Sequence, residues 1–451
     1  MGSLRLGVSL AVISMTLAAA ERGDAAGFAI REQSSVAQGN AFAGATAGAE
    51  DISYMFFNPA ALARFDDYQG HTSLSYIIPE AKFRDGEATT IEGTEISGTD
   101  NSGDIGDDAL VPALYLAAPV GEGVQFGLGI TAPFGLVTDN EDGWIGRYHA
   151  LRSDLKTIDI NPTLAIQASP YLSFGLGFRA QYADLELTNA VDFGTIGALS
   201  GNADLAAISQ PTEQDGEARA ELDDWGFGFN LGFLIHPTEE TRFGIAYRSA
   251  IDHDARGDAE FDLGDSGVGA AISQASGQFV DTGASLDVST PARLSIGGYH
   301  ELTDKFAIMG EVAWTDWSTF DELRVQFDNE AQADSVTEEE WEDSYFFALG
   351  ASYRLQPNLT LRGGIAYDES PIPDEFRTPR VAGNDRYWLS VGGDYQPMSG
   401  LSLSLSYTHI FVDDGDLDLQ ATDEGNTFRG DLSGSYENQI DIITVSGTIH
   451  F

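Results

Sequence analysis

The chain has 451 residues, contains no cysteine and carries a formal net charge of -48 at pH 7. The excess of acids argues against nucleic acid as a partner, because phosphate binding needs a basic surface, and the lack of cysteine excludes disulfide scaffolds and thiolate metal sites. The mean hydropathy is slightly negative and the only long apolar run is 6–20, which excludes a bundle of transmembrane helices but not a membrane β-barrel, whose strands alternate in polarity.

The N-terminus has the pattern of a secretory signal peptide. Arg5 precedes an apolar run of about 15 residues, and small residues follow it. Cleavage after Ala20 or after Ala25 would satisfy the small-residue rule, and Ala25 is preferred because the next segment then begins at the new N-terminus. We therefore expect residues 1–25 to be a signal peptide.

Residues 26–66 differ from the rest of the chain. Pro59 cannot lie in a central strand, and Asn58 before it favours a turn. Small side chains that permit tight packing recur at Gly39, Ala41, Ala43, Gly44, Ala45, Ala47, Gly48 and Ala49. The segment is predicted to be a compact plug, enclosed by a barrel that the following residues form.

From about residue 67 onward, apolar and polar residues alternate with a period of two, which is typical of β-strands. The clearest examples are 124–131, 172–179, 225–235 and 401–407. The second face of these strands is largely Gly, Ser, Thr and Asn rather than charged. This pattern suits a wall whose bulky apolar face meets lipid and whose inner face packs closely on something else.

Turn signals divide this region into strands. Short connections are predicted at 119–123, 169–170, 236–240, 302–305, 356–358 and 397–400. Long acidic or Gly-rich connections lie between them, at about 85–108, 135–152, 189–218, 259–287, 329–341, 369–385 and 414–436. Six short and seven long connections imply 14 strands, an even number as in bacterial outer-membrane barrels.

The last segment supports closure of the barrel. Residues 443–451 alternate in polarity and end on Phe451, as the last strands of outer-membrane proteins do. In hydrocarbon every backbone amide must be paired, and without apolar helices only a closed barrel achieves this. Aromatic residues near strand ends are expected to form girdles at the level of the lipid headgroups: Trp314, Trp317, Tyr353, Trp388 and Tyr407.

Several short blocks occur in a fixed order along the chain. They are Ala26-Gly27-Phe28, Asn58-Pro59-Ala60, Asn161-Pro162-Thr163-Leu164-Ala165, Trp314-Thr315-Asp316-Trp317-Ser318-Thr319-Phe320, Tyr367-Asp368-Glu369-Ser370-Pro371-Ile372-Pro373 with Arg377 after it, and Asp385-Arg386-Tyr387-Trp388-Leu389-Ser390. In this order the blocks resemble those of the outer-membrane long-chain fatty-acid and aromatic-hydrocarbon transporter family. The resemblance extends through most of the chain after the signal peptide.

The resemblance implies an all-β fold, a 14-stranded antiparallel transmembrane β-barrel of residues 67–451 with residues 26–66 as a hatch inside its lumen. It implies passive uptake of hydrophobic small molecules across the outer membrane of a Gram-negative bacterium, without a cofactor, a metal or an enzymatic reaction. The ligand would be captured at extracellular loops, pass to a lumenal pocket and leave by hatch movement and lateral opening. The implied ligand-binding or gating residues are Ala26, Gly27, Phe28, Asn58, Pro59 and Ala60.

The resemblance places lateral opening at a kink in the third strand, where Pro133, Phe134 and Gly135 are the candidates. Pro133 removes a donor from the hydrogen-bond ladder, which would make local unpairing easy. The alternative is that Pro133 only terminates the strand.

The residues near the fifth strand bear on the substrate. Fatty-acid members place a basic residue after the tyrosine of the fifth strand, whereas the matching stretch here, 182–186, is acidic. A ligand carboxylate would be repelled there unless another cation intervened. The candidate cations are Arg179, Arg248, Arg293 and Arg362, each of which could instead pair with a carboxylate of the wall. A hydrophobic molecule, either a fatty acid or an aromatic hydrocarbon, is therefore predicted without a choice between them.

The same residues argue against other functions. A lipid hydrolase needs a serine beside a histidine, and the nearest pair in sequence, Ser406 and His409, is three residues apart. A general porin needs an open lumen, which the plug would close. A calcium loop at 100–104 lacks the required glycine, because Ile105 occupies that position.

The acidic connections favour a solvated surface or, alternatively, divalent-cation bridges to lipopolysaccharide. The expected partners are the ligand and outer-membrane lipid, and the chain is expected to be a monomer.

Overall fold

The computed structural model describes residues 27–451, which form one antiparallel sheet with an N-terminal segment inside it. The expected signal peptide, residues 1–25, and Ala26 lie outside the described residues. The strands are β1 (Gln69–Thr89), β2 (Ala109–Gly121), β3 (Val124–Thr131), β4 (Gly135–Asp139), β5 (Arg152–Ser169), β6 (Leu172–Asp192), β7 (Asp215–Ile235), β8 (Thr241–Arg248), β9 (Ile251–Asp262), β10 (Thr282–Thr290), β11 (Arg293–Thr303), β12 (Phe306–Thr315), β13 (Glu322–Phe327), β14 (Ser335–Glu338), β15 (Ser344–Gln356), β16 (Leu359–Asp368), β17 (Arg386–Met398), β18 (Leu401–Val412), β19 (Gly415–Leu419) and β20 (Asp431–His450).

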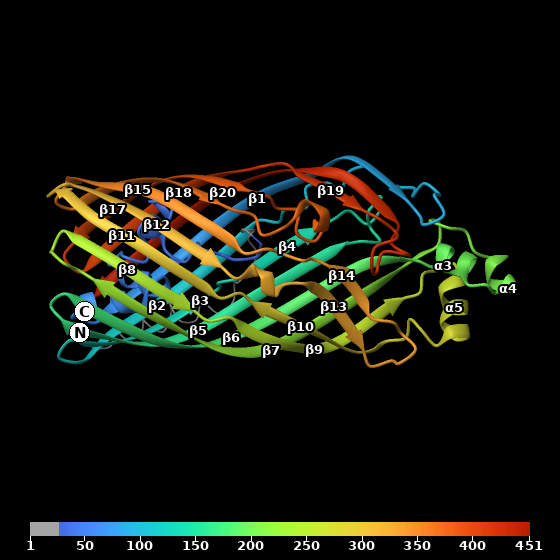
Figure 1. Ribbon diagram of the computed structural model, residues 1–451, viewed down its shortest axis with the longest axis horizontal. Helices are drawn as coiled ribbons and strands as arrows, with labels where there is room; N and C mark the ends of the chain where they lie inside the picture. The colour runs from blue at the N-terminus through green and yellow to red at the C-terminus, as the bar shows by residue number, and fades with distance from the viewer. Residues whose placement is uncertain (1–26) are drawn as a thin grey trace.

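These 20 segments build 14 barrel strands, because six of the barrel strands consist of two consecutive segments each. The continued strands are β3/β4, β8/β9, β10/β11, β12/β13, β14/β15 and β18/β19. Neighbouring strands pair antiparallel around the cylinder, and β1 pairs with β20 from Gln69↔His450 to Thr89↔Asp431. The sheet has no free edge (Figure 1), so the predicted closed barrel of 14 strands is confirmed.

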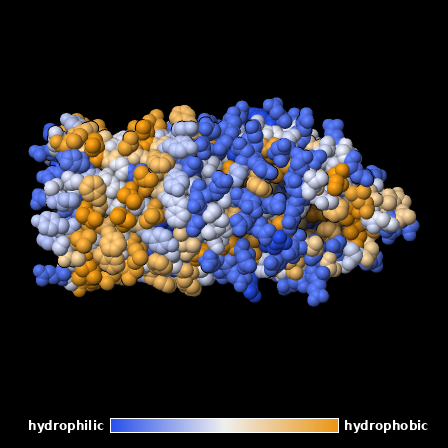
Figure 2. All heavy atoms as spheres, in the orientation of Figure 1, coloured by the Kyte–Doolittle hydropathy of each residue, from blue (hydrophilic) through white to orange (hydrophobic). Residues whose placement is uncertain are grey.

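The polarity of the strands inverts along the barrel axis. In β7, Trp225 and Phe233 face outward at the end with the short turns, whereas the exposed residues nearer the long loops are acidic, for example Glu221. The inward-facing residues change in the opposite sense: near the short turns the strand presents Gly232 to the lumen, and nearer the long loops it presents the buried, apolar Leu222. On the face that Figure 2 shows, an apolar band covers one half of the cylinder, and the wall of the other half is largely hydrophilic up to its tip.

The apolar band fits the thickness of a membrane. In β7 it runs over residues 225–235, and a tilted strand needs about 9–11 residues to cross the hydrocarbon. The outer half of the barrel therefore stands in water, where an acidic exterior and an apolar interior are favourable. No helix among residues 27–451 is long and apolar enough to cross a membrane.

All six short connections lie where they were predicted. The seven long ones also lie in the predicted places: the connection 369–385 has the predicted bounds, and the other six are shorter than predicted. The connection expected at about 189–218, for example, spans only 193–214, because β6 and β7 continue well beyond the membrane. The long loops carry α3 (Phe193–Leu199), α4 (Ala203–Ala206) and α5 (Val268–Ser276), which lie together at the end of the cylinder opposite the C-terminus (Figure 1). Two short 3-10 helices follow, η3 (Trp317–Thr319) and η4 (Asp374–Phe376).

The prediction that these aromatic residues form girdles at the lipid headgroups is only partly correct. Tyr353 and Tyr407 are exposed on the outer face, but Trp317 and Trp388 are buried inside the barrel. Trp388 faces inward because it lies on β17 between the outward residues Tyr387 and Leu389. The register of the strand, rather than its nearness to a strand end, decides which face an aromatic residue occupies.

Residues 27–64 contain no barrel strand and fill the lumen in the membrane half. They form α2 (Ser35–Gln38), η1 (Ile52–Phe56) and η2 (Pro59–Arg64), which lie inside the cylinder (Figure 1). Nearly all of these residues are buried. The helix α2 contacts β1, β17, β18 and β20, whereas η2 contacts β3, β5, β6 and β7. We call residues 27–64 the plug.

Wall glycines allow the backbone of the plug to approach the wall closely. A Cβ atom on Gly364 would lie 2.0 Å from the carbonyl oxygen of Asn40, and one on Gly244 would lie 1.9 Å from that of Thr46. Backbone atoms cannot move aside as a flexible side chain can. The glycine-rich inner face noted in the sequence therefore provides room for the plug.

We expect Gly364→Val to displace the plug from the wall, because overpacking typically costs about 1–3 kcal/mol. The measurement is hydrogen–deuterium exchange in the plug around Asn40, which should become faster. Gly393→Val is the matched control on β17, since a Cβ atom there meets nothing closer than 3.5 Å. Equal exchange in the two variants would show that the plug does not depend on this close approach.

Candidate functional site

Phe28 is enclosed by four aromatic rings at the outer end of the plug. Its side chain is only 3% exposed. The ring centroids lie 4.7 Å (Trp317), 5.7 Å (Phe320), 5.7 Å (Trp341) and 6.0 Å (Phe134) from that of Phe28. Gly27 has a φ of 62° and a Cβ atom there would lie 2.7 Å from the rings of Trp317 and Trp341. Only glycine fits this position, both for its backbone conformation and for space.

The wall is interrupted beside Phe28, between β3 and β4. Thr131 is paired with Asp159 and Gly135 with Lys156, so the register shifts by one residue between these pairs. Pro133 lies inside this interruption, where its missing N–H costs no ladder hydrogen bond. Pro133 thus sits at a bulge within one continued strand.

The plug supplies the hydrogen bonds that the interrupted wall lacks. Backbone Ile30 N donates to Pro133 O at 2.8 Å, and Gly135 N donates to Phe28 O at 2.9 Å. The side-chain amide of Gln33 donates to Ala132 O at 2.8 Å and accepts from Ala132 N at 3.3 Å, as a neighbouring strand would. The first residues of the plug are therefore part of the wall at this point.

The sequence reasoning missed Gln33. The sequence shows a glutamine within a run of small residues, but it does not show that the glutamine binds Ala132, which lies 99 residues away. Pairing between a side-chain amide and a backbone amide has no sequence pattern of its own.

The second predicted group, Asn58, Pro59 and Ala60, lies elsewhere in the plug. Asn58 caps η2 by accepting from Ala60 N at 3.0 Å, and its amide donates to Thr46 O at 2.7 Å and Phe233 O at 3.0 Å. Phe233 is near the short turn at the end of β7. The structure therefore does not bring these residues together with Phe28; their contacts anchor the plug to the wall.

A cavity of about 40 Å³ lies beside the plug, and Phe134 and Trp317 are part of its lining. Its charged lining consists of four arginines and one carboxylate: Arg31, Arg179, Arg248, Arg293 and Asp368. Arg179 and Arg248 share the buried carboxylate of Asp159, at 2.6 and 2.9 Å. We call this space the arginine cavity.

Arg293 is the arginine in this cavity without a carboxylate. Among the described residues, no carboxylate oxygen lies within 4.0 Å of its guanidinium group, and its buried Nε has no hydrogen-bond partner. Register places it directly opposite Arg248 on the neighbouring strand. An anion in the cavity would therefore find an unpaired donor on Arg293.

Two predictions about how the lumen would treat a ligand carboxylate are wrong: the repulsion by the acidic stretch 182–186, and a place for Arg362 beside the other arginines. Asp184 is exposed on the outer face of β6 and Glu186 shares that face, whereas Ala183 and Leu185 point inward. The acidic stretch therefore does not repel a ligand in the lumen. Arg362, in contrast, is not in the cavity: it pairs with Asp394 at 2.5 Å.

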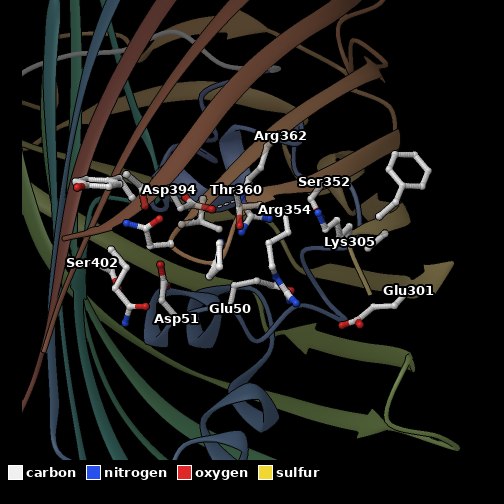
Figure 3. Close-up of a pocket in the computed structure, with 18 of the residues that line it drawn as sticks. Glu50, Asp51, Glu301, Lys305, Ser352, Arg354, Thr360, Arg362, Asp394 and Ser402 are labelled. Atoms are coloured by element: carbon white, nitrogen blue, oxygen red, sulfur yellow. Dashed lines mark hydrogen bonds and ion pairs between the residues drawn. The ribbon is translucent and has the colours of Figure 1, made fainter. Parts of the chain in front are cut away.

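Arg362 belongs to a second cavity, of about 360 Å³, at the end of the barrel with the short turns. Figure 3 shows Glu50 and Asp51 of the plug there, together with Arg362 and Asp394 of the wall. Glu50 is held by Arg242 at 2.7 Å. This polar, largely charged lining is unfavourable for a hydrophobic molecule, and its ion pairs hold the base of the plug.

The residues considered for catalysis do not form a site. The hydroxyl of Ser406 points inward, 3.1 Å from that of Ser35, whereas His409 lies on the opposite face and pairs with Asp441 at 2.8 Å. Among residues 27–451, no three His, Asp or Glu side chains are gathered so that they could hold a metal ion.

These features define the class of protein: an outer-membrane β-barrel whose lumen is stoppered by its own N-terminal segment. Residues 16–451 match the model of the family described as outer membrane protein transport protein (OMPP1/FadL/TodX), and the chain belongs to this family. Its members are channels for hydrophobic compounds in the outer membrane of Gram-negative bacteria and catalyse no reaction.

The chain is similar to several known members. It is 31% identical over 403 residues to the long-chain fatty acid transport protein of Escherichia coli O6:H1, covering 85% of this chain and 87% of the relative. It is 30% identical over 429 residues to outer membrane protein P1 of Haemophilus influenzae, covering 89% of each. The crystal structure of a Pseudomonas aeruginosa FadL homologue matches with a TM-score of 0.87 at 24% identity, over 94% of this chain and 100% of that one.

Proposed function

We propose that the hydrophobic compound carried by this channel is a long-chain fatty acid, bound in the arginine cavity through its carboxylate. The observation that carries this proposal is Arg293, a lumenal cation that has no carboxylate partner among residues 27–451 and lies beside the aromatic residues around Phe28. A charge-assisted hydrogen bond to a carboxylate is stronger than one between neutral groups. The relative at 31% identity that is named a long-chain fatty acid transport protein supports the same choice.

The lining above the cavity supports passage of a hydrocarbon chain. Apolar residues of the outer half, such as Leu222 and Leu286, form one buried cluster, and the residues around Phe28 form another. Leu155, Val288 and Leu323 contact both clusters. In the proposal the ligand is captured at the extracellular loops and moves along this continuous apolar lining by passive diffusion.

Release would couple hatch movement to lateral opening. The cavity of about 40 Å³ has room for a carboxylate but not for a long chain, so binding would displace Phe28 and its neighbours. Displacement would remove the four hydrogen bonds that residues 28–33 make to 132–135. The kink at Pro133, Phe134 and Gly135 would then be free to part, and the ligand would leave sideways into the membrane.

In this scheme residues 1–25 are the signal peptide, residues 26–66 are the hatch, with Ala26, Gly27 and Phe28 at the ligand and Asn58, Pro59 and Ala60 as its anchor, and residues 67–451 are the barrel. The chain would act as a monomer. The acidic exterior of the outer half would meet lipopolysaccharide, and the apolar band would meet membrane lipid.

Binding of oleate and of toluene to purified protein tests the proposal. Arg293→Gln should weaken oleate binding by about tenfold or more, the effect of losing one charge-assisted hydrogen bond, and should leave toluene binding unchanged. Arg256→Gln, which removes an exposed arginine paired with Asp254, is the matched control. Tight binding of toluene but not oleate by the unmodified protein would instead support uptake of aromatic hydrocarbons.

A further inference from the structure

The connection 369–385 folds into the lumen instead of extending from the barrel. Its two flanking strands end at the pair Asp368↔Arg386, whereas β6 and β7 continue well beyond the membrane. Residues 377–382 of the connection are all buried. We call residues 369–385 the strap, and residues 378–382 its tip.

The strap crosses the lumen to the opposite wall. Arg380 donates to the carbonyl of Arg152 at 3.2 Å and to Ser153 Oγ at 3.0 Å, both on β5. In return, Thr138 Oγ1 on β4 donates to the carbonyl of Arg380 at 3.2 Å. Counted along the chain, β5 is the fourth of the 14 barrel strands, and β16, where the strap begins, is the eleventh. These two strands therefore lie on opposite sides of the cylinder.

Three consecutive residues of the tip contact three different parts of the lumen. Arg380 lines a cavity of about 40 Å³ among the apolar residues of the outer half. Val381 belongs to the cluster around Phe28, and Ala382 belongs to a third apolar cluster, which includes Trp144. The tip therefore lies where the outer lumen meets the residues around Phe28.

The free space beside the tip is small. On the side of β4, the tip shares with Leu136 and Thr138 a cavity of about 30 Å³, which is close to the volume that one water molecule occupies in the liquid. The cavity beside Arg380 is hardly larger, at about 40 Å³. A hydrocarbon chain fits into neither space, so its passage requires the tip to move.

The base and the tip of the strap are held differently. At the base, Arg377 is fully buried and donates to Asp416 O on β19 at 2.8 Å, and Asn384 donates to Asp414 O at 2.8 Å. The three hydrogen bonds of Arg380 described above tie the tip to β4 and β5, and among residues 27–451 no ion pair joins the strap to these two strands. Such bonds add little net stability, because water replaces them when the tip moves.

We propose that the strap is an inner gate, held shut by Arg380, through which the ligand passes from the outer lumen to the arginine cavity. Arg380 is a positioning residue in this gate, since it holds the tip against β5. The gate is separate from the hatch and from the kink at Pro133, because it belongs to the connection between β16 and β17. The inference rests on the proposed function, because it takes the arginine cavity as the destination of the ligand.

A gate that closes again behind the ligand changes the rates of binding and leaves the affinity as it is. The strap is in place both before the ligand arrives and after it is bound, so its hydrogen bonds oppose only the step between these states. Weakening the tip should therefore accelerate association and dissociation by the same factor.

Stopped-flow binding of parinaric acid, a fluorescent long-chain fatty acid, to the purified intact protein tests the gate. Arg380→Gln should raise both rate constants by about tenfold or more, because it removes hydrogen bonds from a charged donor, and should leave Kd unchanged. Arg429→Gln is the matched control. It removes the same charge from the same cavity, but Arg429 donates to Ser335 and Val336 of β14 rather than to the strap or to β5. Its rate constants should equal those of the unmodified protein.

A reversible cross-link tests the same gate from the closed side. The chain contains no cysteine, so Thr138→Cys and Val381→Cys, at two positions that line one cavity, introduce a unique pair of thiols. Joining them with a disulfide-containing cross-linker should stop the association of parinaric acid, and reduction of the linker should restore it. This measurement also serves if Arg380→Gln does not fold.

The outcomes separate this inference from the proposed function. If Arg380→Gln raises Kd without faster association, or if the cross-linked protein binds as fast as the reduced one, the strap is not a gate and the proposed function stands. If the unmodified protein binds no fatty acid, the proposed function itself fails. Naphthalene, a fluorescent aromatic hydrocarbon, then tests the strap in the same variants: equal rates with and without the cross-link would overturn the gate.

Discussion

Deletion of residues 27–40 is expected to convert the sealed barrel into an ion-conducting pore. The deleted segment fills the lumen against β1, β17, β18 and β20, and the wall closes through β1–β20 pairing that does not involve it. A barrel of this strand number has a lumen wider than the side chains of its wall can fill. Planar-bilayer recording should show a large, steady, ohmic conductance in the deletion variant and none in the intact protein.

Deletion of residues 203–208 is the control for this experiment. These residues form the exposed tip around α4, at the outer end of the cylinder and away from the plug (Figure 1). Both proteins should keep the heat-modifiable electrophoretic migration of a folded barrel. A folded variant without residues 27–40 that conducts no better than the control would show that this segment does not seal the lumen.

Replacing Gln33 by leucine should loosen the wall at the kink. The variant keeps a similar volume but leaves the buried N–H and C=O of Ala132 without the partners they now have at 3.3 and 2.8 Å. Each buried backbone group left unpaired costs about 1–3 kcal/mol. Hydrogen exchange at Ala132 and Gly135 should therefore become at least about tenfold faster, since 1.4 kcal/mol corresponds to a factor of ten.

Gln38→Leu is a matched control within the same plug. Gln38 is also fully buried, but its amide donates to Thr408 Oγ1 of β18 at 3.2 Å and Ile442 O of β20 at 3.4 Å, and β1 and β2 separate these strands from β3. Its loss should destabilise the plug there without faster exchange at Ala132. If both variants accelerate exchange at the kink equally, the plug acts on the wall as a whole and Gln33 has no special part in it.

The local pattern of the chain was sufficient to predict the wall. Alternation in segments such as 225–235, with turn residues at fixed places, predicted the strands, their number and their closure, because a two-residue period and a tight turn are both local properties. The plug was predicted for a similar reason: a run of small residues ending in Asn58 and Pro59 cannot form a central strand.

The candidate site could be predicted only in part. Phe28 and Pro133 were singled out by resemblance, but nothing in the sequence showed that residues 28–33 complete the wall at 132–135. Arg293 was one of four arginines predicted as possible partners of a ligand carboxylate. Only its neighbours in space distinguish it from Arg362, which is paired with Asp394.

By itself the sequence determined which residues alternate and where the chain turns. These two properties predict a closed barrel whose lumen is filled by the plug. The tertiary structure alone decided which face of each strand is apolar at each level of the barrel. Lipid surrounds the half with the short turns, so apolar side chains such as Phe233 face outward there. Water surrounds the other half, so apolar side chains such as Leu222 turn inward and line a path for a hydrophobic ligand.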